Sequence, residues 1–164
     1  MKLLDQRQIK QKIKRLAIEI MEHNFDEKEL ILAGINNNGV GFANLLYQEL
    51  KSMSDLTIHL TRIKLSPANP LSTPISIEMS PKQLNGKTVI IVDDVANTGR
   101  TIFYATKPIL EVLPKKVEVA VLVDRKHKSF PIQPNYVGIS LATTIKDNID
   151  VILKDASAMY AVLM

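Results

Sequence analysis

The stretch VIIVDDVANTGRT, residues 89–101, decides the fold class of this chain. It starts with four consecutive β-branched apolar residues, which is typical of a strand buried on both faces of a parallel sheet. Two carboxylates, Asp93 and Asp94, follow at once, and a Thr-Gly-Arg-Thr turn then leads into a segment with helical character. A buried strand that passes through a polar loop into a helix is the repeating unit of α/β proteins.

The same alternation of strands and helices extends along the rest of the chain. Residues 5–24 carry apolar side chains at helical spacing, with Asp5 at the N-cap position. Further strands are predicted at residues 30–33, 56–64 and 117–123, further helices at residues 41–51 and 101–113, a turn at residues 85–86 and an irregular loop at residues 66–74. The pattern predicts a parallel sheet flanked by helices, in one domain that spans residues 1–164.

The composition narrows the class of protein. The chain has 164 residues, 46% of them hydrophobic, which is enough for one domain with a core. It has no cysteine, and His23, His59 and His127 lack metal-ligand spacing, so we expect no disulfide and no metal site formed by the protein. The charged N-terminus and the lack of a long apolar run predict a cytoplasmic protein with no membrane contact. The net charge of +4 suits anionic partners.

Ligand-binding residues are expected beyond the carboxyl ends of the strands, where parallel sheets bind ligands. Three loops, at residues 35–39, 93–101 and 124–128, would share this rim. The carboxylates of Asp93 and Asp94 can accept hydrogen bonds from both hydroxyls of a vicinal diol. In the following loop, Gly99 lets the backbone approach an anion, and Thr98 and Thr101 add hydroxyl donors. A diol site followed directly by a phosphate site predicts binding of a ribose 5-phosphate.

Residues 89–101 resemble the phosphoribosyl diphosphate (PRPP) signature of type I phosphoribosyltransferases. The segments VLVDRKHK (121–128) and PIQPNYVG (131–138) resemble the base-binding end of one subfamily, the bifunctional pyrimidine operon regulator/uracil phosphoribosyltransferase. The resemblance covers nearly the whole chain. It implies a parallel sheet with a small hood over the active site, a homodimer, and transfer of ribose phosphate from PRPP to a base with Mg2+ as cofactor.

The resemblance also implies a role for each site residue. Asp93 and Asp94 would be catalytic and would hold the ribose hydroxyls. Arg125 would be catalytic at the base or diphosphate end. Tyr136 would stack on the base, and the backbone near Val137 would read the base edge. The cradle of the 5-phosphate would be formed by Ala96, Asn97, Thr98, Gly99, Arg100 and Thr101.

Three departures from the family pattern bear on the transfer step. The loop that grips diphosphate carries two cations in relatives, whereas here it consists of Asn36, Asn37, Asn38 and Gly39. An Arg-Asp-Asp run expected in the hood is Arg-Ile-Lys at residues 62–64, and a Lys-Asn pair is Ile-Ser at residues 139–140. Because no charge in the loop opposes the leaving diphosphate, we expect ribose-phosphate binding with slow transfer.

The resemblance leaves the base and the biological role to be decided. Asn97 stands where purine-using relatives place an Asp, and its amide cannot act as a base, which favours uracil or another pyrimidine over a 6-oxopurine. The alternative function is a non-catalytic regulator that senses a nucleotide and binds RNA. Its RNA surface would combine the cations Lys10, Lys12, Lys14 and Arg15 with Arg125, Lys126 and Lys128.

Overall fold

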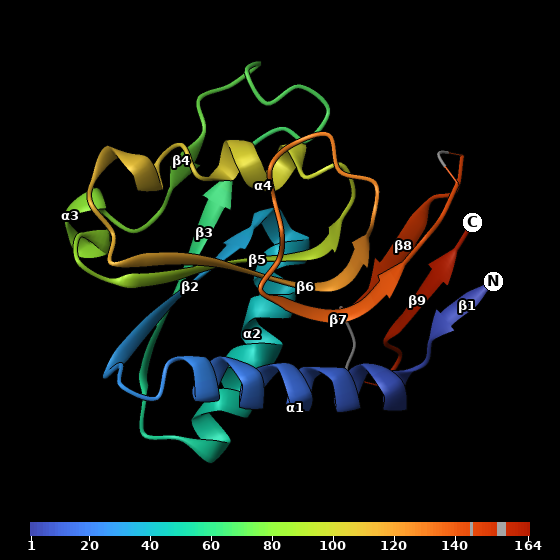
Figure 1. Ribbon diagram of the computed structural model, residues 1–164, viewed down its shortest axis with the longest axis horizontal. Helices are drawn as coiled ribbons and strands as arrows, with labels where there is room; N and C mark the ends of the chain where they lie inside the picture. The colour runs from blue at the N-terminus through green and yellow to red at the C-terminus, as the bar shows by residue number, and fades with distance from the viewer. Residues whose placement is uncertain (145, 154–156) are drawn as a thin grey trace.

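A computed structural model describes residues 1–144, 146–153 and 157–164. Its centre is a six-stranded sheet in the order β4-β3-β2-β5-β6-β7 (Figure 1). The strands are β2 (Glu29–Ile35), β3 (Thr57–Lys64), β4 (Ser76–Ile77), β5 (Thr88–Ala96), β6 (Lys116–Arg125) and β7 (Tyr136–Leu141). All neighbouring strands run parallel except β4, which pairs antiparallel with β3 at the edge. The α/β fold predicted from the sequence is therefore confirmed.

Helices cover both faces of this sheet. The long helices α1 (Gln6–His23) and α2 (Asn36–Met53) pack on one face, and α3 (Pro81–Leu84), α4 (Arg100–Ala105) and the 3-10 helix η1 (Ile109–Glu111) lie on the other (Figure 1). Each face has its own apolar core, built mainly from Ile, Leu and Val. Because the central strands are buried on both sides, they form the rigid base from which the site residues project.

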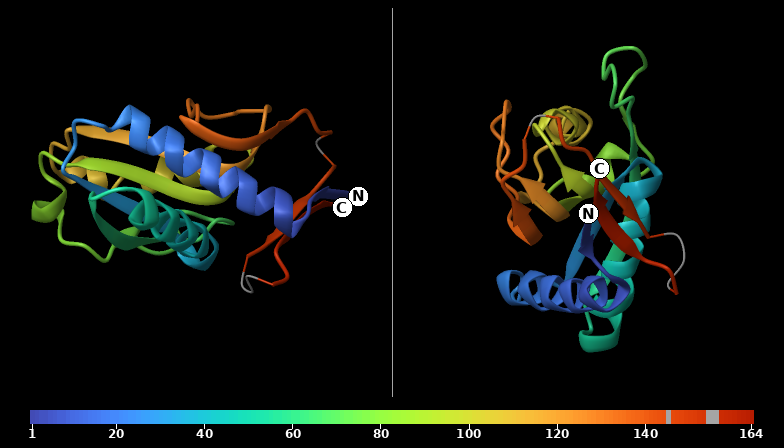
Figure 2. Two further views of the ribbon diagram at one scale, coloured as in Figure 1. Left: turned by 90° about the horizontal axis from the view of Figure 1, so that it is seen from below. Right: turned by 90° about the vertical axis from the view of Figure 1, so that its right-hand side faces the viewer.

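A second, smaller sheet stands at one end of the molecule and forms the hood. Its order is β1-β9-β8, with β1 (Lys2–Leu4), β8 (Ile149–Ile152) and β9 (Tyr160–Leu163) all antiparallel. The two chain ends lie side by side in it (Figure 2), and the Met1 amino group donates to the Leu163 carbonyl at 2.6 Å. No helix in the described part of the chain has the length and apolarity that crossing a membrane requires.

Local sequence signals placed the long helices and the central strands, but they did not predict β1, β4, α3, η1, β7 (Tyr136–Leu141), β8 or β9. Helix α1 begins after Asp5 as expected, because the Asp5 carboxylate accepts from the Gln8 backbone N–H at 2.8 Å and the Gln8 side-chain oxygen accepts from the Asp5 backbone N–H at 2.9 Å. The helix expected over residues 101–113 ends at Ala105, since Pro108 has no N–H to continue it. The family pattern assigned residues 62–64 to the hood. In the structure Arg62 lies on β3 of the central sheet.

Candidate active site

The carboxyl ends of β2 and β5 meet the hood around a cavity of about 400 Å3. Asp93 and Asp94 line it from β5, Asn37 and Asn38 line it from the start of α2, and Asp150 lines it from β8. Asn97 and Thr101 of the predicted phosphate loop also contribute to its wall. The structure thus brings the predicted ribose loop and the predicted diphosphate loop, which lie more than fifty residues apart in the sequence, to one site.

The acidic pair is held at the end of a strand that is longer than the sequence suggested. Strand β5 continues through the two carboxylates to Ala96, in register with β6. Asp93 accepts a hydrogen bond from the amide of Asp94 at 3.0 Å, and Asp94 accepts one from the amide of Val95 at 2.8 Å. These bonds fix both side chains at the cavity.

Burial makes the charged form of this pair costly. Desolvation raises the pKa of Asp93 well above its ordinary value, and the neighbouring charge of Asp94 raises it further. Desolvation also raises the pKa of Asp94, with a smaller contribution from Asp150. A ligand that donates hydroxyl hydrogen bonds or brings positive charge would therefore relieve the electrostatic cost of ionising this pair.

The loop after β5 turns at Gly99, and the Arg100 amide in this turn donates to Thr98 Oγ1 at 3.3 Å. Gly99 has a φ of +87°, a conformation that residues with a Cβ rarely adopt. A Cβ on Gly99 would also lie 3.1 Å from Ile132. The carbonyl of Thr98 accepts bonds from the amides of Ser129 and Phe130, which anchors the loop from outside. The guanidinium of Arg100 points elsewhere and donates to the Pro67 carbonyl at 2.7 Å.

The predicted diphosphate loop is the first turn of α2. The helix begins at Asn36, five residues earlier than expected, and no acidic residue stands in its first turn. Gly39 is required there, because a Cβ would come within 2.5 Å of the Val92 carbonyl of β5. The free amides and the dipole of an 18-residue helix favour an anion at this end.

Asn36 and Asn38, which occupy the positions of the two family cations, differ in their surroundings. The side chain of Asn36 donates to the Leu65 carbonyl at 2.9 Å and accepts from the Leu65 amide at 3.1 Å. Asn36 also has a φ of +52°. Asn38 is exposed and lines the cavity. Asn36 is therefore a structural anchor, whereas Asn38 is available to a ligand.

Comparisons with known proteins identify the family of this chain. The sequence profile described as "Phosphoribosyl transferase domain" matches residues 1–155. The chain belongs to the phosphoribosyltransferase family. Relatives named "Bifunctional protein PyrR" are 37% identical in Microcystis aeruginosa, over 93% of this chain and 90% of that protein, and 32% identical in Brevibacillus brevis, over 96% and 92%.

Solved structures share the phosphoribosyltransferase fold. A hypoxanthine-guanine phosphoribosyltransferase from Bacillus anthracis superposes with a TM-score of 0.79 at 19% identity, over 99% of this chain and 96% of that one. A hypoxanthine phosphoribosyltransferase from Staphylococcus aureus gives a TM-score of 0.74 at 20% identity, over 88% and 80%. At this identity the match establishes the fold, which confirms the fold family predicted from the sequence.

Arg125 connects two loops of this phosphoribosyltransferase instead of lining the cavity. Its guanidinium donates to Asn97 Oδ1 at 3.2 Å, to Thr143 Oγ1 at 2.7 Å and to the Thr144 carbonyl at 2.7 Å. It therefore ties the phosphate loop to the segment after β7. These contacts favour a positioning role over the direct catalytic role that the resemblance implied.

In the third predicted rim loop, residues 124–128, side chains bind other residues of the same loop. The ammonium group of Lys128 donates to Asp124 Oδ1 at 2.6 Å and to the carbonyl of Arg125. In the described part of the chain, none of these residues lines the cavity around the acidic pair. The loop supports the site from outside.

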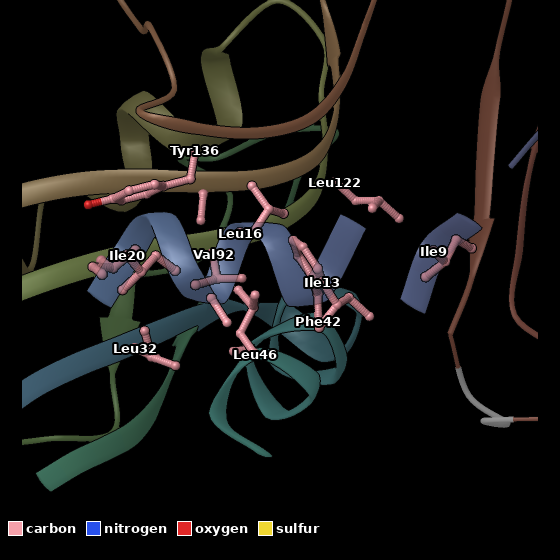
Figure 3. Close-up of a cluster of buried hydrophobic side chains, with 14 of the residues drawn as sticks. Ile9, Ile13, Leu16, Ile20, Leu32, Phe42, Leu46, Val92, Leu122 and Tyr136 are labelled. Atoms are coloured by element: carbon pink, nitrogen blue, oxygen red, sulfur yellow. The ribbon is translucent and has the colours of Figure 1, made fainter. Parts of the chain in front are cut away.

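Tyr136 is not a base-stacking residue in this structure, which corrects the expectation. Its side chain is fully buried between α1 and the sheet (Figure 3). Its hydroxyl donates to Glu118 at 2.8 Å and accepts from Asn24 at 3.1 Å, and burial raises the pKa of Tyr136. An aromatic ring in this core cannot reach a base at the carboxyl ends of the strands.

The strand that carries Tyr136 is nevertheless close to the site. Val137 pairs with Val121 of β6, which pairs with Asp93 of β5, so Val137 lies level with the acidic pair. Its carbonyl is already used, because Arg15 of α1 donates to it at 2.6 Å and to the Gly138 carbonyl at 2.8 Å. A role for the Val137 backbone in reading the base stays a prediction.

Asp150 is the site residue that sequence reasoning missed. It lies on β8, far along the chain from the acidic pair, and no local motif marks it. It also lines a neighbouring cavity of about 360 Å3, together with Asp94 and the first turn of α2. The hood therefore contributes an acid after all, from a strand at the other end of the sequence.

Proposed function

We propose that this protein binds PRPP and transfers its ribose 5-phosphate to a pyrimidine, uracil in the first place. The observation that carries the proposal is the single cavity that joins Asp93 and Asp94 to the first turn of α2. A diol site and an anion site in one cavity, beside a loop shaped for the 5-phosphate, match the three polar parts of PRPP. Membership of the phosphoribosyltransferase family supports the same reaction.

In the proposed reaction, N1 of uracil forms a bond to C1 of the ribose while the bond from C1 to the diphosphate breaks. The electron pair leaves with the diphosphate, and the N1 proton passes to water. Asp93 and Asp94 hold the ribose hydroxyls and orient C1, and the amides at the start of α2 face the departing diphosphate. With Asn38 in place of a cation, the developing charge is stabilised less, and we expect transfer to be slow.

A Mg2+ ion fits this site as part of the substrate complex. No group of three or more His, Cys, Asp or Glu side chains in the described part of the chain could hold a metal ion. Mg2+ is usually held by one or two carboxylates and by substrate phosphates, and Asp93 and Asp94 supply the carboxylates at this cavity. When bound, the ion would neutralise charge on the diphosphate oxygens.

Asn97 supports a pyrimidine over a purine. Its side-chain oxygen accepts the bond from Arg125, so the amide is held in place at the cavity wall. An amide has no carboxylate that could exchange a proton with a purine ring. The resemblance to the bifunctional pyrimidine operon regulator/uracil phosphoribosyltransferase supports the same preference, and relatives of this chain are named "Bifunctional protein PyrR".

Calorimetry and a transfer assay test the proposal. We expect the protein to bind UMP and PRPP with Mg2+, and the double variant Asp93→Asn with Asp94→Asn to lose most of this affinity. Incubation with PRPP, Mg2+ and single bases should give UMP faster than any purine nucleotide. The proposal fails if wild type binds neither ligand, if the double variant binds as well as wild type, or if hypoxanthine is used faster than uracil.

A second candidate function, RNA binding by a nucleotide-sensing regulator, is favoured by one surface feature. A groove of about 980 Å3 between α1 and the hood is lined by the cations Lys2, Arg7, Lys10 and Lys14. Three of the other cations expected to join them bind elsewhere, since Arg15 binds β7 carbonyls, Arg125 binds Asn97, and Lys128 binds Asp124. Filter binding of the upstream mRNA leader should decrease steeply with salt, and should be lost in Lys10→Gln with Lys14→Gln.

A further inference from the structure

Arg125 holds the side chain of Asn97 at the wall of the cavity that contains the acidic pair. Its Nη1 donates to Asn97 Oδ1 at 3.2 Å, while Nε donates to Thr143 Oγ1 at 2.7 Å and Nη2 to the Thr144 carbonyl at 2.7 Å. The backbone N–H of Thr144 in turn donates to Asp147 Oδ2 at 2.8 Å, which stabilises the segment after β7. The guanidinium is therefore fixed on three sides and cannot follow Asn97 into another orientation.

This contact sets which end of the Asn97 amide meets a ligand. A guanidinium has only donors, so the atom of Asn97 that faces Arg125 must be the carbonyl oxygen and not the NH2 group. The NH2 group is thereby turned away from Arg125, and no hydrogen bond among the described residues uses it. Asn97 is exposed and lines the cavity together with Asp93 and Asp94. Asn97 therefore offers hydrogen-bond donors to a ligand in this cavity.

A pyrimidine nucleotide would meet these donors with one edge of its base. Under the proposed function, Asp93 and Asp94 hold the ribose hydroxyls, and the loop at residues 96–101 holds the 5-phosphate. In an anti nucleotide, the C5–C6 edge of the pyrimidine lies on the side of the 5-phosphate, and the exocyclic atom on C4 is the polar atom next to that edge. Because Asn97 lies at the start of the phosphate loop, its NH2 group is placed to contact the atom on C4.

We propose that Asn97, oriented by Arg125, donates to O4 of the base and thereby selects uracil over cytosine. This inference rests on the proposed function, which supplies the ribose and phosphate contacts. Uracil has a carbonyl oxygen on C4, which accepts the bond. Cytosine has an amino group there, so two donors would face each other and lose their partners. Arg125 is a positioning residue for this recognition, because it acts only through Asn97.

Calorimetry with UMP and CMP tests this inference, because the two ligands share ribose and phosphate and differ only at C4 and N3 of the base. We expect wild type to bind UMP about tenfold more tightly than CMP, the usual scale for one hydrogen bond set against an unpaired donor. Asn97→Ala should remove this preference and keep the affinity for ribose 5-phosphate, which has no base, within about twofold. Asn97→Asp should reverse the preference, because a carboxylate keeps the bond to Arg125 and presents an acceptor to the amino group of cytosine.

A second pair of variants tests the positioning role of Arg125. Arg125→Met removes every donor to Asn97 and leaves the amide free to turn over, so the preference for UMP should fall from about tenfold to about twofold or less. A purely structural role would change stability without changing the ratio of the two affinities. Lys107→Met is the matched control. It removes the same charge from an exposed position past the end of α4, outside the lining of the cavity, and should leave the preference unchanged.

The outcomes separate this inference from the proposed function. If wild type binds CMP as tightly as UMP, or if Asn97→Ala or Arg125→Met keeps the full preference, the inference is wrong and the proposed function stands. It is also wrong if Asn97→Ala weakens ribose 5-phosphate as much as UMP, because the amide then serves the phosphate. If wild type binds neither UMP nor PRPP, the proposed function itself fails. Asn97 is exposed, so its variants keep the test valid even where Arg125→Met lowers the melting temperature.

Discussion

Asn36→Lys restores a family cation to the start of α2, yet we expect this substitution to lower the free energy of unfolding. The substitution removes the two hydrogen bonds between the Asn36 side chain and the backbone of Leu65. Leu65 is only 6% exposed, so its N–H and C=O would lose their partners without free access to water. The φ of +52° at Asn36 suits Asn better than Lys.

The magnitude follows from these contacts. Two net hydrogen bonds contribute about 1 kcal/mol each, and the left-handed backbone adds about 1 kcal/mol of strain for Lys. A loss of about 3 kcal/mol corresponds to a fall in melting temperature of roughly 6–12 °C for a domain of this size. Urea unfolding followed by circular dichroism should show a lower midpoint with an unchanged slope.

Asn37→Lys provides the matched control. Asn37 is the next residue in the same turn, is exposed, and has no side-chain hydrogen bond among the described residues. We expect this variant to stay within about 0.5 kcal/mol of wild type. If Asn36→Lys and Asn37→Lys have equal midpoints, the anchoring role of Asn36 is refuted. By the same reasoning, Asn38→Arg alone should raise transfer about tenfold without loss of stability.

Three further predictions concern the acidic pair, the core and the assembly. Folding favours the protonated form of Asp93, because burial raises its pKa, so the stability of the ligand-free protein should fall as pH rises through that raised pKa. Asp93→Asn should therefore be more stable than wild type at pH 7, and its free energy of unfolding in urea should depend less on pH above the ordinary pKa of an Asp; an unchanged pH dependence would contradict this. Tyr136→Phe should cost about 1 kcal/mol by removing the hydrogen bond from the Tyr136 hydroxyl to buried Glu118, which keeps a bond from Asn24 at 3.3 Å; UMP affinity should stay within about twofold, and a large affinity loss at unchanged stability would restore the base-stacking role. We expect a homodimer, and light scattering that gives a monomer at micromolar concentration would rule it out.

Sequence signals succeeded where neighbouring residues are enough to set the structure. The β-branched run before Asp93 forms a central strand, and the Asp5–Gln8 capping box begins α1, because both depend on contacts within a few residues. The alternation of strands and helices was enough to predict the parallel sheet. The end of α4 was also within reach, because Pro108 is a local signal that the expected helix did not take into account.

Side chains whose roles depend on distant segments could not be assigned in this way. Tyr136 suited a base-stacking position by its motif, but the packing of α1 against β7 buries it beside Glu118. Arg125 suited catalysis by its place at the carboxyl end of β6, but the segment after β7 folds back and occupies its guanidinium. In both cases the residue type was compatible with two environments, and the tertiary contacts decided between them.

The sequence by itself determined the sheet, the acidic pair and the phosphate loop, because strand burial, carboxylate chemistry and a glycine turn are properties of consecutive residues. Only the tertiary structure decided which cavity these residues share and which partners they meet there. The hood places Asp150 opposite Asp94, and the end of β3 brings Arg62 and Lys64 beside the α2 turn that lacks its own cations. The physical reason is that electrostatic and hydrogen-bonding partners act through a few ångströms of space, whatever their separation along the chain.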